Sequence, residues 1–133
     1  MKKIIVLLLV MALTVCSLAS CGAKPNSDPE AAKLALQNAG YFVEQARIIM
    51  DADYFEGVVQ AYRASGSRGV SNIELTICYF ESTDAATNAW NNEEVKSFIK
   101  VEESGTWIPD TFVAKKVGNI IYFGDKEMVK DAK

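Results

Sequence analysis

Histidine is absent from the 133 residues, and cysteine and proline occur only three times each. The lack of histidine excludes histidine-based triads, histidine metal sites and a histidine general acid or base. No G-x-S-x-G nucleophile elbow occurs either. The adjacent acids Glu93-Glu94 and Glu102-Glu103 lie in polar stretches, with no apolar setting that would raise a carboxyl pKa. We therefore expect a protein that is not an enzyme.

Clusters of basic residues are also missing, since 14 Lys and Arg face 17 Asp and Glu. Nucleic acids and anionic lipid surfaces both require clustered positive charge, so we expect no nucleic-acid partner. Asp51-Ala52-Asp53 has the spacing of two calcium ligands, but Phe55 and Glu56 stand where an EF-hand loop needs an oxygen ligand and a glycine. We expect no metal and no cofactor.

The one long apolar run lies at the N-terminus. Lys2 and Lys3 precede an uncharged apolar stretch over 4–15, and a group of small residues closes it at Ser20. This is the three-part layout of a secretory signal. The stretch is too short to cross a hydrocarbon core of about 30 Å, which needs ~20 residues. The pattern therefore predicts an export signal and not a permanent membrane helix.

The end of this run resembles the lipobox of bacterial lipoproteins, in the sequence LASCG at 18–22. The resemblance implies cleavage by a lipoprotein signal peptidase just before Cys21 and a diacylglyceryl group on its thiol. Cys16 is the rival candidate, but the bulky Val15 before it fits the pattern less well. The alternative is an ordinary signal peptide cut near Ala19 or Ser20, which would leave Cys21 free.

The resemblance divides the chain into a lipoprotein signal peptide (1–20), a lipidated cysteine with a short tether (21–27) and one domain (28–133). Two acyl chains on Cys21 would hold the protein firmly, whereas one chain holds only marginally. The tether reaches at most ~20 Å when extended. The implied location is the extracytoplasmic face of the cell membrane, and the implied partner is that membrane.

Local signals predict most of the domain's elements. Asp28 before Pro29, or Ser27 with Glu30, begins a helix over 29–39, which Gly40 ends. Strands are expected over 41–49, 57–64 and 73–81, with the middle one open to a helical alternative. A flexible connection over 65–69 is expected between the second and third strands. Cys78 lies in the apolar run of the third strand and is expected to be buried.

The second half shows a further helix and a hairpin. Residues 83–101 carry apolar side chains on two opposite faces, so either the helix breaks at Asn91-Asn92 or it is covered on both sides. Gly118-Asn119 predicts a two-residue turn in a hairpin over 111–124, followed by a helix that Asp125 caps. Alternation in this hairpin puts one set of side chains on the core face: Phe112, Ala114, Ile121 and Phe123. The opposite set is Val113, Lys115 and Tyr122.

Together these elements predict an α+β fold: a mostly antiparallel sheet of four to five strands with two to three helices packed on it. The expected order is α-β-β-β-α-β-β-α, because strands joined by short turns pair antiparallel. We expect the strand over 73–81 to lie near the centre of the sheet.

Function is the least determined property. Trp107 and Ile108 stand together in a loop, where they either fold back on the core or form an exposed anchor for a partner, and Tyr122 is the third candidate binding residue. We expect a membrane-anchored, non-catalytic module that binds an envelope protein or a small ligand. A structural subunit of an envelope complex is the alternative. A carboxylate-based hydrolase is less favoured.

Overall fold

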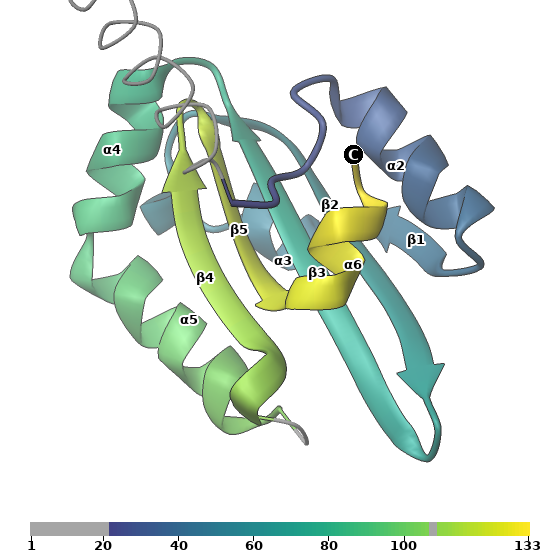
Figure 1. Ribbon diagram of the computed structural model, residues 1–133. Helices are drawn as coiled ribbons and strands as arrows, with labels where there is room; N and C mark the ends of the chain where they lie inside the picture. The colour runs from purple at the N-terminus through teal and green to yellow at the C-terminus, as the bar shows by residue number, and fades with distance from the viewer. Residues whose placement is uncertain (1–21, 107–108) are drawn as a thin grey trace, which may run out of the picture.

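The computed structural model describes residues 22–106 and 109–133. A five-stranded antiparallel sheet with strand order β1-β2-β3-β5-β4 forms the centre of the molecule (Figure 1). The strands are β1 (Phe42–Gln45), β2 (Val58–Arg68), β3 (Ser71–Phe80), β4 (Phe112–Val117) and β5 (Ile120–Asp125). The helices are α2 (Pro29–Asn38), α3 (Arg47–Met50), α4 (Thr83–Asn91), α5 (Glu93–Ser104) and α6 (Lys126–Asp131), with short 3-10 turns at Asp53–Phe55 and Pro109–Thr111. None of these helices is long and apolar enough to cross a membrane.

The α+β class and the antiparallel sheet are confirmed, and β3 lies at the centre as expected. Helix α2 begins where the sequence indicated, because the Asp28 carboxylate accepts the Glu30 N–H at 3.1 Å. It ends before Gly40, whose φ of +95° suits glycine. The described ranges contain five helices where two to three were expected, because α3 replaces the end of a predicted strand and the predicted helix over 83–101 is divided into α4 and α5.

The predicted strand over 41–49 is too long. Strand β1 pairs with β2 only from Phe42 to Gln45, and the last bond of this edge joins the Ala46 N–H to the Ala61 carbonyl at 2.9 Å. The chain then turns into α3, which buries Ile49 against the sheet. Tertiary burial of Ile49 therefore overrides the strand preference of these branched residues.

The ambiguous segment over 57–64 is a strand, as preferred. However, the flexible connection expected over 65–69 is wrong, because β2 and β3 remain paired as far as Arg68 and Ser71. Gly66 has a packing role in this ladder: a Cβ there would lie 2.7 Å from the Tyr41 ring. The turn itself is only Gly69 and Val70.

The second helix breaks at Asn92. This residue has extended backbone angles, and its side-chain oxygen accepts the N–H groups of Glu94 at 2.8 Å and Val95 at 3.4 Å. The cap lets α4 and α5 take different directions, so that each turns its own apolar stripe toward the sheet. Of the two alternatives for residues 83–101, the break is therefore the one adopted.

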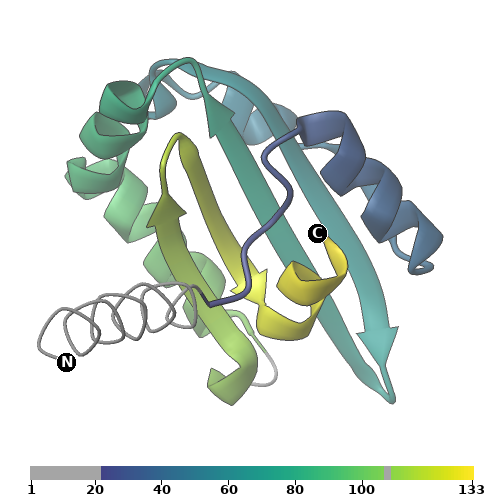
Figure 2. The same ribbon diagram turned by 45° about the horizontal axis from the view of Figure 1, so that its top comes forward.

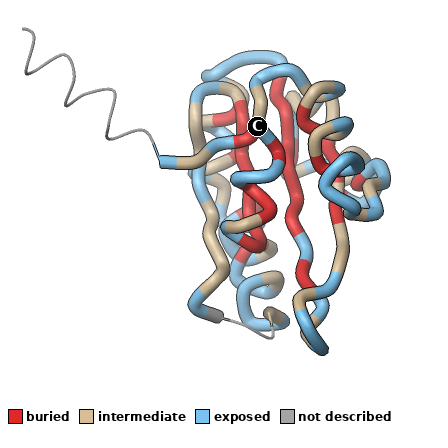
Figure 3. The backbone as a smooth tube through the Cα atoms, turned by 45° about the vertical axis from the view of Figure 1, so that its right-hand side comes forward, coloured by how far each residue is buried: buried red, intermediate tan, exposed pale blue. Residues whose placement is uncertain are grey.

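Both faces of the sheet are buried. The first face carries Tyr79 and Tyr122 and is covered by α2 and α6; the second carries Cys78 and Phe123 and is covered by α3, α4 and α5. Figure 3 shows the buried residues concentrated along the central strands. The hairpin set predicted to face the core packs in the second cluster, and the predicted two-residue turn at Gly118-Asn119 is present. Of the opposite set, Tyr122 is buried and Val113 is half-buried against the first cluster, because helices lie on both sides of the sheet, whereas Lys115 is exposed.

Residues 22–27, expected to be a free tether, lie across the first face of the sheet (Figure 2). We call this segment the N-terminal strap. The Asn26 N–H donates to the Ala132 carbonyl at 2.7 Å, and the Tyr79 hydroxyl donates to the Asn26 carbonyl at 2.7 Å. Pro25 is buried. Because its backbone groups and apolar side chains find partners on the sheet, the strap is part of the packed domain.

Candidate functional site

The second face of the sheet is left partly open where its covering helices end. One cavity of about 420 Å³ lies between α5 and strands β2, β3, β4 and β5, and we call it the α5 cavity. Another of about 580 Å³ lies beside β1 and α3. Arg63 and Thr76 line both, so we refer to the two together as the Arg63 groove. These volumes are in the range of small-molecule sites.

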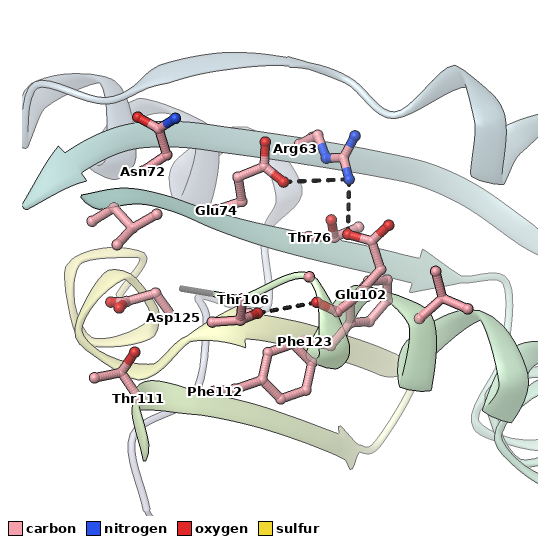
Figure 4. A pocket seen from close by; sticks show the side chains of 14 residues that line it. Arg63, Asn72, Glu74, Thr76, Glu102, Thr106, Thr111, Phe112, Phe123 and Asp125 are labelled. Carbon is pink, nitrogen blue, oxygen red and sulfur yellow. Dashed lines mark hydrogen bonds and ion pairs between the residues drawn. The ribbon is translucent and has the colours of Figure 1, made fainter. Parts of the chain in front are cut away.

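Arg63 is placed in the groove by the strand register. It lies opposite Glu44 of β1 and Thr76 of β3, so their side chains emerge on the same face. Its Nη2 atom lies 2.9 Å from Glu102 Oε2, on α5, and 3.5 Å from Glu74 Oε2, on β3 (Figure 4). One guanidinium nitrogen therefore holds two carboxylates and joins the sheet to the helix.

Thr76 provides an unusual polar group in the same place. It is 3% exposed and lines both cavities. No hydrogen bond joins its hydroxyl to another group in the described part of the chain. Within those ranges every fully enclosed polar side-chain atom has a partner, so this hydroxyl must be open to the groove. A polar group at this depth needs water or a ligand to complete its hydrogen bonds.

Aromatic side chains form the apolar side of the groove. Phe112 and Phe123 line the α5 cavity, and Phe98 lines the cavity beside α3. The Phe98 and Phe123 rings meet edge to face with centroids 6.0 Å apart. Val101 of α5 is 67% exposed at the rim. The groove thus combines a charged centre with apolar walls.

Asp125 lies at one end of the α5 cavity, and both of its carboxylate oxygens are hydrogen-bonded within the protein. Both of its oxygens accept from Arg68 at 2.9 Å, and Oδ1 also accepts the Glu127 and Met128 N–H groups at the start of α6. Burial alone would raise the pKa of Asp125, but these donors outweigh it and hold the pKa below its ordinary value. These contacts favour the ionised form of Asp125 and give it a structural role at the start of α6.

Glu74 and Glu102 of the groove do not have the arrangement of a glycoside hydrolase. Such an enzyme places substrate between two carboxyl groups about 5–9.5 Å apart. In the groove, Arg63 lies between Glu74 and Glu102 and contacts both. The position that a substrate would need is filled by a side chain, so this geometry does not favour the hydrolase alternative.

Of the candidate binding residues singled out from sequence, Tyr122 lies within the described residues, and it does not line the Arg63 groove. Cys21, Trp107 and Ile108 lie outside the described residues. Tyr122 is 1% exposed on the first face, where its hydroxyl donates to the Ala23 carbonyl at 3.1 Å and burial raises its pKa. The Tyr122 ring lies in the core of the domain, where a ligand cannot reach it. Cys78 is buried as expected, and burial raises the pKa of its thiol.

Sequence reasoning missed Arg63 and Thr76. The available signal was an arginine and a threonine within two strands of the sheet, each with apolar residues on either side of it in the chain. Without the strand register, neither could be assigned to a common face. Comparison with known proteins finds no matching family model, no matching curated protein and no matching solved structure.

Proposed function

We propose that the protein is a lipid-anchored, non-catalytic binding module of the cell envelope. Cys21 attaches it to the extracytoplasmic face of the membrane, and the Arg63 groove is its binding site. The proposal rests on the lipobox-like LASCG sequence at 18–22 and on the open, polar-centred groove. The observation that carries the binding role is the hydroxyl of Thr76, a residue only 3% exposed, which opens to the groove without a protein partner among the described residues.

The strap sets how an anchored domain would lie. Gly22 follows the proposed anchor directly, and a Cβ added to it would be 3.4 Å from the Lys115 ammonium nitrogen of β4. From Ala23 onward the strap is bound to the first face of the sheet. Lipid on Cys21 would therefore hold this side of the sheet beside the bilayer, without a flexible linker. The groove, on the second face, would remain accessible.

The structural-subunit alternative would require a continuous apolar surface for other chains. Large apolar residues are exposed on several elements of the described ranges: Leu34, Phe42, Ile48, Val59, Val70 and Val101. An open hollow beside α5 is lined by Tyr54, Phe98 and Val101. We prefer the binding module because the Arg63 groove is deeper and has a charged centre.

Mass spectrometry of the full chain expressed in a bacterial host tests the anchor. We expect an N-terminal peptide that begins at Cys21 and carries a diacylglyceryl group. The Cys21→Ser variant should lose this peptide completely, because serine offers no thiol. The matched control Cys16→Ser should retain it. An unmodified N-terminus at Ala19, Ser20 or Cys21, with the protein free in the medium, would contradict the proposal.

A separate prediction concerns the strap. Tyr79→Phe removes the hydroxyl that donates to the Asn26 carbonyl and should cost about 1 kcal/mol, the usual net value of such a bond. Hydrogen exchange of the Asn26 amide, which donates to Ala132, should speed up by roughly fivefold. Tyr54→Phe is the control, since no hydrogen bond of the Tyr54 hydroxyl is found within the described ranges. Equal exchange rates in the two variants would contradict a docked strap.

A further inference from the structure

We propose that the open hollow beside α5 is a docking surface for a basic segment of a partner protein. We call it the Tyr54 hollow; its volume is about 470 Å³, and it is lined by Tyr54, Glu93, Glu94, Ser97, Phe98 and Val101. It shares Phe98 and Val101 with the cavities of the Arg63 groove, but neither Arg63 nor Thr76 lines it. The inference therefore goes beyond the proposed function and does not depend on a ligand in the groove.

Two half-buried aromatic rings form the apolar part of the hollow. The ring centroids of Tyr54 and Phe98 lie 6.5 Å apart, and both rings pack on the buried Phe55, at 5.2 Å and 5.8 Å. Val101 lies at the same surface and is 67% exposed. Because Phe55 holds the two rings in place, a partner meets apolar surface that is already ordered. Covering this surface removes it from water, which favours association.

Acidic side chains surround this apolar surface. A second hollow, of about 320 Å³, meets the first at Tyr54, and four further acids line it: Asp53, Glu56, Glu81 and Asp84. No lysine or arginine lines either hollow. Of all the acids that line the two hollows, only Glu93 has an ion-pair partner within the described ranges, Lys96 at 2.7 Å. The surface therefore presents negative charge that the domain itself leaves unpaired.

This charge selects a basic partner, because specific interfaces bring opposite potentials together. A lysine or arginine side chain can lay its apolar stem on an aromatic ring, and the faces of Tyr54 and Phe98 also attract its positive charge. A leucine or similar residue beside it would cover Val101. The Tyr54 hollow thus suits a segment in which basic and apolar residues are mixed.

Two other occupants fit the surface less well. A metal ion needs several ligands close together, and in the part of the chain that the structure describes no group of three or more Asp, Glu or Cys side chains could hold one. The acids are instead spread over two adjoining hollows, which suits charges spaced along a chain segment. A second copy of this protein would bring a chain of net charge -3 to an acidic surface.

Calorimetric titration of the full chain in micelles of a non-ionic detergent tests the class of partner. The probe is a short synthetic peptide of alternating lysine and leucine. Two control peptides replace either every leucine by serine or every lysine by glutamate. We expect saturable binding of the lysine–leucine peptide that weakens as salt is added, because salt screens exposed charges. Equal affinity of either control peptide would overturn the proposal, as would failure of the lysine–leucine peptide to bind.

Paired variants locate the peptide on the surface. Glu94→Gln and Val101→Ser should each weaken binding by roughly threefold, through a lost exposed charge pair and lost apolar contact. Glu103→Gln and Val70→Ser are the matched controls, because both residues are exposed and line neither hollow. Both controls should bind the peptide like the wild type. Since all four positions are exposed, the variants should fold.

Two results would contradict the location or the occupant. Equal losses in the variants and their controls would put the peptide elsewhere and overturn the surface. Self-association of the protein that Val101→Ser abolishes would assign the hollow to a second copy and overturn the basic partner. Glu94 lines no part of the Arg63 groove, so its effect distinguishes this surface from the groove. The lipid analysis of Cys21 is unaffected by any of these outcomes.

Discussion

Replacing Gly124 by alanine is expected to destabilise the domain by about 3–5 kcal/mol, the upper range for overpacking combined with backbone strain. Gly124 lies on β5 opposite Leu75 of β3. A Cβ there would be 2.3 Å from the Glu74 carbonyl oxygen and 2.7 Å from Leu75 Cα, and the φ of Gly124 is +137°. Both neighbours are backbone atoms of the central strand, so no side-chain rotation can relieve the clash. The β3–β5 pairing would have to separate.

Urea unfolding followed by circular dichroism measures the free energy of unfolding. In a separate thermal scan, the melting temperature should fall by on the order of 10 °C or more. Gly118→Ala is the matched control. Gly118 also has a positive φ, +58°, but nothing lies within 4 Å of the added Cβ. Its cost should therefore be only the backbone strain, about 1 kcal/mol. Similar losses in the two variants would contradict the close contact between β3 and β5.

Asp125→Ala is expected to cost about 2–4 kcal/mol, from a lost helix cap and a lost charged pair. The carboxylate is 3% exposed, accepts two bonds from Arg68 and caps the first turn of α6. Arg68 itself is 38% exposed, so water screens part of this interaction. Asp28→Ala is the control, because Asp28 caps α2 from an exposed position with a single bond to the Glu30 N–H. It should cost about 1 kcal/mol.

Asp125 also makes the stability of the domain depend on pH. The pKa of Asp125 is lower in the folded protein than in the unfolded chain, where an aspartate titrates near pH ~4. Its stabilising contribution is therefore fully present above about pH 4 and is lost as the pH falls through the folded pKa. Melting temperatures of wild type and Asp125→Ala, measured from pH 7 to pH 2, should converge at the acid end. A constant difference across this range would contradict the assigned charge state.

Local chemistry explains the parts of the fold that were predicted. Asp28 and Gly40 bound α2 because capping and left-handed backbone depend on a few adjacent residues. The turn at Gly118-Asn119 and the alternation along β3 are local in the same way. The end of the strand at Gln45 was missed because it depends on where Ile49 is buried, which is a tertiary property.

The candidate site could not be predicted for a related reason. Arg63 and Glu102 are 39 residues apart and come from a strand and a helix. Their contact depends on the strand order, the register of β2 against β3 and the direction that α5 takes after Asn92. Tyr122 was a candidate binding residue on the hairpin face opposite the predicted core set. The strap and α6 cover that face instead.

The amino-acid sequence by itself determined the fold class, the ends of α2, the starts of α4 and α6, the tight hairpin turn and the lipobox-like pattern at Cys21. Each of these features depends mainly on residues that lie within a few positions of one another in the chain. Only the tertiary structure decided that both sheet faces are covered, that the strap is docked and that Arg63, Thr76 and Glu102 meet in one groove. These features arise from pairing between distant segments, and hydrophobic periodicity records that a side chain is buried but not which partner buries it.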